Sequence, residues 1–244
     1  MIVIPMAGLS SRFFKAGYDK PKYMLEAHGR TLFEHSVLSF EKYFQSEPFL
    51  FIIRDSYDTL SFVSHQVKAL GIKDYQVVIL DHDTRGQAET VYLALQQAKN
   101  NDQPLTIFNI DTFRPGFEFP AESQKGSGYL EVFHGPGEHW SFVQPATPDS
   151  DIVARTTEKE RISDLCSTGL YHFTNASDFI DAFERYLNTP EEDWPKGELY
   201  IAPLYNFLIS KGKSIHYHLI ALQDVIFCGT PAEYKEFLAL ETSN

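Results

Sequence analysis

The sequence predicts an α/β fold in which a doubly wound, mixed but mostly parallel sheet lies between two helical layers, beside a smaller antiparallel lobe. Three observations support this prediction. Strand-length apolar runs alternate with helix-length apolar stripes through the first part of the 244-residue chain. Hydrophobic residues make up 43% of the chain, enough to cover both faces of a sheet. The second part changes to short alternating segments separated by Gly and Pro, a pattern typical of antiparallel strands.

The first half contains four strand-like runs with helical stripes between them. The chain starts with an apolar run, and the fourth run ends on Asp111. Because strands and helices alternate, we expect right-handed crossovers within a parallel sheet. The expected strands are 1–7, 49–53, 75–80 and 105–110, and the expected helices are 33–44, 60–70 and 88–98.

The second half is expected to add strands to the same sheet. Its last helix has a clear start, because Thr230 can cap it, Pro231 suits the first helical position and Glu233 completes a capping box. No repeat or low-complexity linker divides the sequence, so residues 1–244 are expected to form a single domain with two lobes. The expected strands are 128–133, 140–144, 152–155, 168–173, 215–220 and 225–228, and the expected helices are 177–187, 202–210 and one from 230.

Charge and cysteine content restrict the class of protein. The chain carries 21 Lys plus Arg against 33 Asp plus Glu, a net charge of −12, which argues against general binding of nucleic acid or an anionic membrane. Cys166 and Cys228 show no ligand spacing, so two reduced, mostly buried thiols are expected. The apolar start is too short for a signal peptide, and no apolar run approaches ~20 residues. We therefore expect a cytoplasmic protein.

A cluster of cations stands out near the start of this acidic chain. Arg12, Lys15, Lys20 and Lys22 follow the Gly/Ser turn that leaves the first strand. Ligands of open α/β sheets bind at the carboxyl ends of the strands, and a loop of small residues can point backbone N–H groups at phosphates there. The alternative is an ordinary strand–helix turn with solvated cations. The cluster favours a small anionic ligand.

Read as a whole, "MAGLSSRF…DKPKYML" resembles the signature of the sugar-phosphate nucleotidylyltransferases. The signature is a glycine-rich loop ending in Arg, followed by Pro-Lys; Ser10 stands where members of the family usually have a second glycine. The resemblance implies a Rossmann-like nucleotidyltransferase fold, with Arg12 and Lys22 as catalytic residues. The loop that it implies for nucleotide binding consists of Ala7, Gly8, Leu9, Ser10 and Ser11.

Four later stretches follow in the order of the family. "RGQAETV" (85–91) is similar to its base-reading loop, which implies that Gly86 and Gln87 contact the nucleobase. "FNID" (108–111) is similar to the strand end whose aspartate, here Asp111, binds Mg²⁺. "TEKERISD" (157–164) and "STGLYHF" (167–173) resemble the acceptor-binding segments. The implied acceptor contacts are Glu158, Lys159 and Gly169.

The closing stretch "GTPAEY" (229–234) departs from the family pattern at one position. Many members have an aspartate two residues before the glycine as a second Mg²⁺ ligand, but this chain has Phe227 there. Asp224 is the nearest substitute, although an odd offset of three residues puts it on the other face of a regular strand, roughly 10 Å away. We expect Asp224 to join Asp111 if a bulge redirects it. Otherwise Asp111 would hold Mg²⁺ with substrate phosphates and water.

The resemblance implies an enzyme that joins CTP, dTTP or UTP to a sugar phosphate or another small phosphorylated acceptor, releases pyrophosphate and uses Mg²⁺. About 1–125 would be the nucleotide-binding half and about 126–244 the acceptor-binding half. Nucleophile and triphosphate are both anionic, so catalysis needs positioning and charge neutralisation more than a general base. Surface-polysaccharide biosynthesis is the implied use, without nucleic acid or membrane as partners, and a homo-oligomer remains open.

Two other classes of protein compete with this hypothesis. A glycosyltransferase of similar fold would consume a nucleotide sugar, but such enzymes usually carry a D-x-D metal motif, and "NIDTF" has one aspartate. A catalytically inactive nucleotide-binding module could keep the same fold. The Pro-Lys signature favours the nucleotidylyltransferase.

Overall fold

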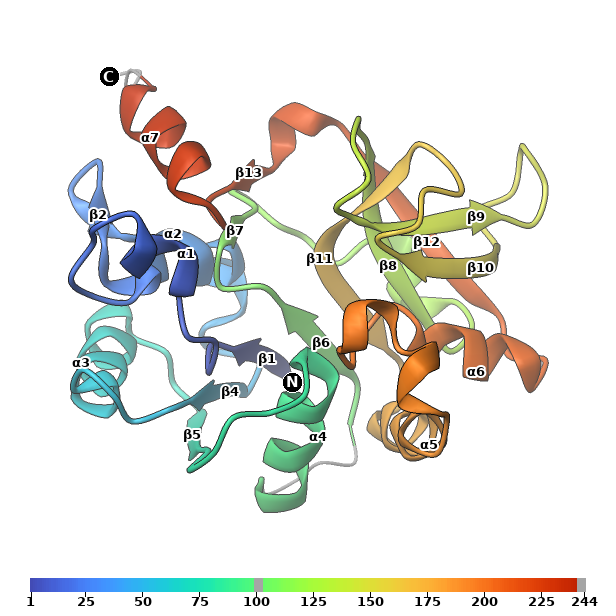
Figure 1. Ribbon diagram of the computed structural model, residues 1–244, viewed down its shortest axis with the longest axis horizontal. Helices are drawn as coiled ribbons and strands as arrows, with labels where there is room; N and C mark the ends of the chain where they lie inside the picture. The colour runs from blue at the N-terminus through green and yellow to red at the C-terminus, as the bar shows by residue number, and fades with distance from the viewer. Residues whose placement is uncertain (99–102, 241–244) are drawn as a thin grey trace.

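The computed structural model describes residues 1–98 and 103–240. Within them, a nine-stranded sheet forms the centre of the molecule (Figure 1). Seven strands follow one another across it: β10 (Val153–Glu158), β9 (Ser141–Pro145), β11 (Leu165–Phe173), β6 (Leu105–Phe108), β1 (Ile2–Pro5), β4 (Phe49–Ile53) and β5 (Tyr75–Ile79). Two more branch from β11, because β8 (Gly128–His134) pairs with β11 and β12 (Ile215–Ile220) pairs with β8.

Helices cover both faces of this sheet. Side chains alternate along β1, so Ile2 and Ile4 belong to one core cluster and Val3 to the other. The first cluster contains residues of α2 (Leu32–Val37), the 3₁₀ segment η2 (Leu38–Tyr43) and α3 (Thr59–Leu70). The second contains residues of α4 (Gln87–Gln97), α5 (Ala176–Leu187) and α6 (Leu204–Ser210). The predicted three-layer α/β class, with a mostly parallel sheet in its first half, is confirmed.

The second half continues the same sheet in a different style. β11 runs antiparallel to β6, to β8 and to β9, and β9 runs antiparallel to β10. β12 is the exception, because it lies parallel to β8. The register between β8 and β11 shifts between Ser167 and Tyr171, so the two strands are not regular partners there. The pairing of β11 with β6 therefore joins the strands of the second half to those of the first in one sheet.

Shorter elements lie outside the nine-stranded sheet; four of them pair in two separate two-stranded sheets, so the strand expected at 225–228 does not join the main sheet. α1 (Ser11–Lys15) follows β1 and was not expected from the sequence, and α7 (Pro231–Ala239) begins at the predicted cap. The predicted helix 33–44 is a short α2 followed by η2, with a non-helical Phe40. The remaining elements are β2 (Glu26–Ala27), β3 (Arg30–Thr31), β7 (Thr112–Phe113), β13 (Ile226–Phe227), η1 (Lys22–Met24), η3 (Ala121–Gln124), η4 (Glu191–Asp193), η5 (Pro195–Gly197) and η6 (Leu222–Asp224).

Two expectations about the chain as a whole bear on this fold. Cys166 and Cys228 are buried and unbridged. In the described ranges 1–98 and 103–240, no helix has the length and apolarity needed to cross a bilayer.

The carboxyl ends of β1 and β6 lead into the loops that carry Ser10 and Asp111, and α4 begins beside them.

Candidate active site

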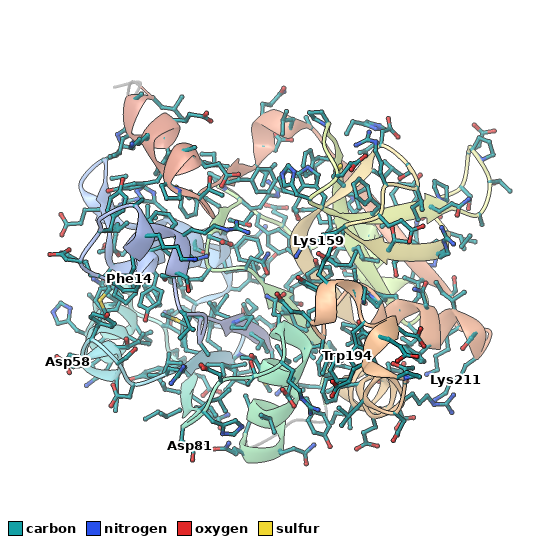
Figure 2. All side chains as sticks on the ribbon, viewed as in Figure 1. Phe14, Asp58, Asp81, Lys159, Trp194 and Lys211 are labelled. Atoms are coloured by element: carbon teal, nitrogen blue, oxygen red, sulfur yellow. The ribbon has the colours of Figure 1, made fainter. Side chains whose placement is uncertain are left out.

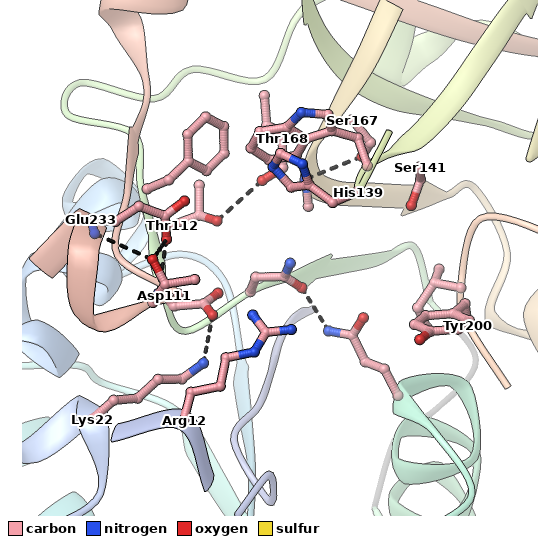
Figure 3. Close-up of a pocket in the computed structure, with 18 of the residues that line it drawn as sticks. Arg12, Lys22, Asp111, Thr112, His139, Ser141, Ser167, Thr168, Tyr200 and Glu233 are labelled. Atoms are coloured by element: carbon pink, nitrogen blue, oxygen red, sulfur yellow. Dashed lines mark hydrogen bonds and ion pairs between the residues drawn. The ribbon is translucent and has the colours of Figure 1, made fainter. Parts of the chain in front are cut away.

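Two adjoining cavities, of about 460 and 740 Å³, lie at the carboxyl ends of β1 and β6. They share lining residues and so form one cleft. After the ligands expected from the sequence, we call it the nucleotide cavity where it is bordered by the loop after β1 and Gly86, and the acceptor cavity where β9–β11 border it. Figure 3 shows part of its wall. The residues that line both cavities are Leu9, Ser10, Ser11, Lys22, Gln87, Asn109 and Asp111.

The loop after β1 is built as a strand-to-helix turn around Ser10. Ser10 adopts a left-handed conformation with φ of 50°, and its Oγ accepts a hydrogen bond of 3.1 Å from the backbone N–H of Lys22. This bond ties the glycine-rich loop to the Pro-Lys segment. Ala7 and Gly8 line the nucleotide cavity, while Arg12 lines the acceptor cavity, into which its guanidinium points (Figure 3).

Lys22 and Asp111 form an ion pair at the junction of the two cavities. Nζ of Lys22 lies 2.5 Å from Oδ2 of Asp111, with 21% and 23% of their side chains exposed. Asp111 follows β6, and its backbone carbonyl accepts a bond of 2.7 Å from the N–H of Cys228. The motif lysine and the motif aspartate, 89 residues apart in sequence, are thus brought together.

The base-reading motif lies at the start of α4. A Cβ on Gly86 would come within 2.4 Å of the carbonyl oxygen of Leu199, so only glycine allows this close approach. Gln87 donates from Nε2 to Oδ1 of Asn109 at 2.6 Å. This bond orients the side-chain amide of Gln87, which lines both cavities. Gly86 lines the nucleotide cavity and not the acceptor cavity. Both predicted residues therefore line the cleft, and their contact with a nucleobase stays a prediction.

The acceptor cavity has a carboxylate in its wall. Glu158 ends β10, and the hydroxyl of Ser141 donates to it; the hydroxyls of Ser141 and Tyr171 also lie 3.1 Å apart. Burial raises the pKa of Glu158, and burial also raises the pKa of Tyr171 to about 12. Gly169 lines the floor with φ of 89°, and a Cβ there would lie 2.3 Å from the Asn109 side chain. This cavity can accept hydrogen bonds from a hydroxyl-rich ligand.

Two of the predicted site residues do not line either cavity. Lys159 has a left-handed backbone, with φ of 54°, and its Nζ donates to the hydroxyl of Tyr200 and lies 4.3 Å from that ring's centroid. Lys159 lies near the centre of the molecule in Figure 2, and Tyr200 lines the acceptor cavity. Asp224 is exposed at the end of η6, and the structure does not bring it to Asp111.

Glu233 is a cleft carboxylate that sequence analysis treated only as a helix cap. Its Oε2 accepts bonds of 2.8 and 3.0 Å from the N–H and hydroxyl of Thr230. A Cβ on Gly229 would lie 2.8 Å from Oδ2 of Asp111 and 3.6 Å from Oε2 of Glu233, so the two carboxylates border the same small space. Glu233 lines the acceptor cavity. Within the described part of the chain, no group of three His, Cys, Asp or Glu gathers as a metal cluster.

Phe227 occupies the position where the family pattern has its second aspartate, and it builds an aromatic wall. Its ring centroid lies 4.8 Å from that of Trp140 and 5.2 Å from that of Phe133. Phe227 and Trp140 both line the acceptor cavity. Lining residues that were not predicted as site residues are Thr112, His139, Ser141, Asn109, Ser167 and Thr168, among others. Asn109, Ser167 and Thr168 lie inside the quoted stretches 108–111 and 167–173, which were the signal for them, whereas the first three come to the cleft only through the fold.

Comparison with known proteins places this cleft in a family. The crystal structure of the nucleoside-diphosphate-sugar pyrophosphorylase from Vibrio cholerae RC9 matches with a TM-score of 0.96 and 59% sequence identity, over 98% of this chain and 100% of that one. The chain matches no protein-family model and no curated protein.

Two more distant structures share the fold. The inositol-1-phosphate CTP transferase from T. maritima has a TM-score of 0.69 at 14% identity, over 98% of this chain and 94% of that one. The UDP-glucose pyrophosphorylase from Acinetobacter baumannii has a TM-score of 0.68 at 16% identity, over 97% and 91%. The 59% identity over nearly the whole length carries more than fold: the chain belongs to the nucleoside-diphosphate-sugar pyrophosphorylases, a family of sugar-phosphate nucleotidylyltransferases.

Proposed function

We propose that this protein transfers the nucleotidyl group of a pyrimidine nucleoside triphosphate to a sugar phosphate and releases pyrophosphate. The observation that carries the proposal is the Lys22–Asp111 ion pair at the junction of the nucleotide and acceptor cavities, with Arg12 in the wall of the acceptor cavity. Two cations and a carboxylate around that junction can hold a triphosphate with its α-phosphate facing the acceptor. The comparisons favour this activity over a glycosyltransferase.

The chemistry is an in-line displacement at the α-phosphorus. An oxygen of the acceptor's phosphate forms the new P–O bond, the bond from the α-phosphorus to the α,β-bridging oxygen breaks, and that oxygen leaves with pyrophosphate. No side chain has to remove a proton, because the attacking phosphate is already ionised. Arg12 would offset charge on the leaving pyrophosphate, and Lys22 would turn from Asp111 to the α-phosphate.

The residues around Gly229 fit a divalent cation. Carboxylate oxygens are the donors that Mg²⁺ prefers, and Asp111 and Glu233 both border the space left open by Gly229. We propose that these two residues hold Mg²⁺ and that Asp224, exposed on η6, does not. When bound, Mg²⁺ would neutralise charge on the triphosphate oxygens.

The acceptor would lie between Gly169 and Glu158, with Lys159 rotating from Tyr200 onto its phosphate. Lys159 has a flexible four-carbon stem, so this movement needs no change in backbone. Hydroxyls of a sugar would donate to Glu158, and the aromatic wall of Trp140 and Phe227 would cover an apolar face of the ring. We further propose that the base is cytosine, thymine or uracil, that the enzyme works in the cytoplasm, and that the nucleotide sugar feeds surface-polysaccharide assembly.

The test is a matrix of substrates. Each of CTP, dTTP, UTP, ATP and GTP is incubated with Mg²⁺ and with hexose 1-phosphates or polyol phosphates, and pyrophosphate release is measured. We expect release that requires an acceptor and is greatest with one pyrimidine triphosphate, and that is lost in Asp111→Asn. Triphosphate binding without turnover for any acceptor would instead indicate an inactive module, and transfer from a nucleotide sugar would indicate a glycosyltransferase.

A further inference from the structure

A buried ion pair lies behind the floor of the acceptor cavity. Arg114 follows β7 and is 8% exposed, and Glu131 in the middle of β8 is fully buried. Nε and Nη2 of Arg114 donate to Oε1 and Oε2 of Glu131 at 2.7 and 3.0 Å, in a two-pronged arrangement. Neither residue lines the cleft, and neither belongs to any motif of the sequence analysis.

Stability alone is a weak reason for such a pair. Moving two charges out of water costs several kcal/mol per ion, and replacing a buried pair with apolar residues of similar size is often neutral or stabilising. A buried pair has a clearer role when it holds neighbouring groups in one arrangement. The contacts of this pair reach both sides of the cleft.

The first contact is with the irregular part of β11. Val132 faces Ser167 and Leu130 faces Tyr171, so Glu131 alone stands opposite the three residues 168–170. Oγ1 of Thr168 donates to Oε1 of Glu131 at 3.1 Å. Thr168 and the adjoining Gly169 line the acceptor cavity, so Glu131 supports the bulge that forms its floor.

The second set of contacts reaches the carboxylate side. Thr112, next to Asp111, donates from Oγ1 to the backbone carbonyl of Thr168 at 3.1 Å, which joins β7 to the bulge. Nη1 of Arg114 donates to the carbonyl of Asp224 at 2.7 Å, at the start of the segment that leads through β13 to Gly229. The N–H of Arg114 donates to Oγ of Ser39 at 2.8 Å, which anchors the pair to η2.

We propose that Arg114 and Glu131 are a positioning pair that fixes the acceptor floor, Thr168–Gly169, relative to the carboxylate side of the cleft at Asp111 and Gly229. This inference rests on the proposed function. The pair would act by keeping the acceptor phosphate aligned with the triphosphate. Ser10 of the loop after β1 and Gln87 hydrogen-bond to Lys22 and Asn109 and not to the pair, so this side of the cleft is expected to bind nucleotide without it.

The test separates alignment from stability. Arg114→Met and Glu131→Leu are each expected to lower the melting temperature, because each leaves one buried charge unpaired, and the double variant is expected to regain it. In the double variant, kcat should nevertheless fall on the order of 100-fold, as expected for a misplacement near 1 Å, and the acceptor KM should rise. The Kd for the triphosphate, from calorimetry, should stay within about twofold, since those contacts are intact.

Two further variants keep the test decisive. Arg114→Lys retains the charge but lacks the fork that reaches both Glu131 and the Asp224 carbonyl, so it should fold and lose kcat. The matched control is Asp178→Asn with Lys213→Met, which removes an ion pair between α5 and the chain before β12, outside both cavities. It should change kcat and KM by less than about twofold. A folded double variant or Arg114→Lys with wild-type kcat and KM would overturn the proposal.

A measurement that needs no turnover tests the positioning role separately from the proposed function. Hydrogen exchange of the ligand-free protein reports on the N–H groups of Gly169, Asn109 and Cys228, which donate to Ser167 Oγ, to the Gly169 carbonyl and to the Asp111 carbonyl. Exchange in these peptides should quicken in the double variant and not in the control pair. If the wild-type protein were inactive with every substrate while exchange behaved so, the proposed function would fail and the positioning role would stand. Unchanged exchange would refute that role.

Discussion

Ser10 shows how one residue can replace a glycine of the family pattern. Its left-handed backbone would suit glycine better, by roughly 1 kcal/mol for an L-residue. The serine hydroxyl offsets that cost by accepting the hydrogen bond from the Lys22 N–H. A glycine there would be unstrained but would release Lys22 from the loop. The departure is therefore compatible with a tight turn at this position.

Arg12 is the residue whose removal tests the turn most directly. We expect Arg12→Ala to lower kcat by on the order of 100-fold or more, because charge developing on pyrophosphate would lose its fixed guanidinium. The fold should be unaffected, since the side chain is exposed. The measurement is steady-state pyrophosphate release, with melting temperature alongside. Lys15→Ala, on the same helix and outside both cavities, is the control and should leave turnover unchanged.

At the scale of elements, two helices begin with the same capping box but in different surroundings. In α2, Oε2 of Glu34 accepts bonds of 2.7 and 2.8 Å from the N–H and hydroxyl of Thr31. In α7, Glu233 and Thr230 repeat this arrangement at 2.8 and 3.0 Å, but beside Asp111. Each helix therefore provides a control for the other.

We expect Glu233→Gln to weaken Mn²⁺ binding about tenfold or more, because one of two carboxylates is lost. Glu34→Gln removes the equivalent carboxylate from a helix cap that lines neither cavity and should leave Mn²⁺ affinity unchanged. Both variants keep an amide oxygen to accept the cap bonds, so both should lose about the same small stability, up to ~1 kcal/mol. Paramagnetic resonance of free Mn²⁺ measures the affinity. Equal affinities in the two variants would leave Asp111 as the single carboxylate.

The long, strongly patterned elements are the ones that sequence predicts. The strands 49–53, 75–80 and 215–220 and the helix 60–70 have apolar spacings that leave little choice, and the structure contains them. The five-residue α1 was missed because such a short helix leaves no periodic signal. Strand direction was also missed for β12, since periodicity says where a strand is and not which neighbour it pairs with.

The sequence predicted the cleft residues on loops and at strand ends better than it predicted where individual polar side chains lie. Loop and strand-end positions such as Gly8, Gly86 and Asp111 line the cleft as expected. Lys159 and Asp224 do not. The Lys159 ammonium bonds to Tyr200 instead, and Asp224 ends η6 before β13 begins, so no bulge in that strand turns it toward Asp111. Whether such a side chain reaches the cleft depends on partners that lie tens of positions away in the sequence.

At the scale of the whole molecule, the interior of the shared sheet contains a histidine that titrates abnormally. His172 in β11 is buried, and its Nδ1 lies 2.9 Å from the hydroxyl of Thr106 in β6. Burial, with a smaller contribution from the positive N-terminus, lowers its pKa from 6.5 to about 4. The folded protein thus keeps this side chain neutral at pH values where the unfolded chain is protonated.

Stability should therefore fall as the solution is acidified. Between pH 6.5 and about 4 the unfolded chain gains a proton at this residue that the folded protein does not, and below about 4 the loss levels off. The full difference is worth up to about 3 kcal/mol. Urea unfolding of the wild type and of His172→Asn at pH 7, 5.5 and 4 measures it, because other groups titrate in both proteins. Parallel pH curves would contradict the assignment.

The pairing of β11 with β6 on one side and with β8 and β9 on the other has a mechanical consequence. A hinge between the two halves would have to break ladder bonds along residues 170–173, where backbone groups are buried and water cannot replace them. A closing movement that pivots on these strands is therefore disfavoured. Under the proposed function, admission of ligands would depend on rotations of long side chains such as Lys22 and Lys159 more than on movement of the sheet.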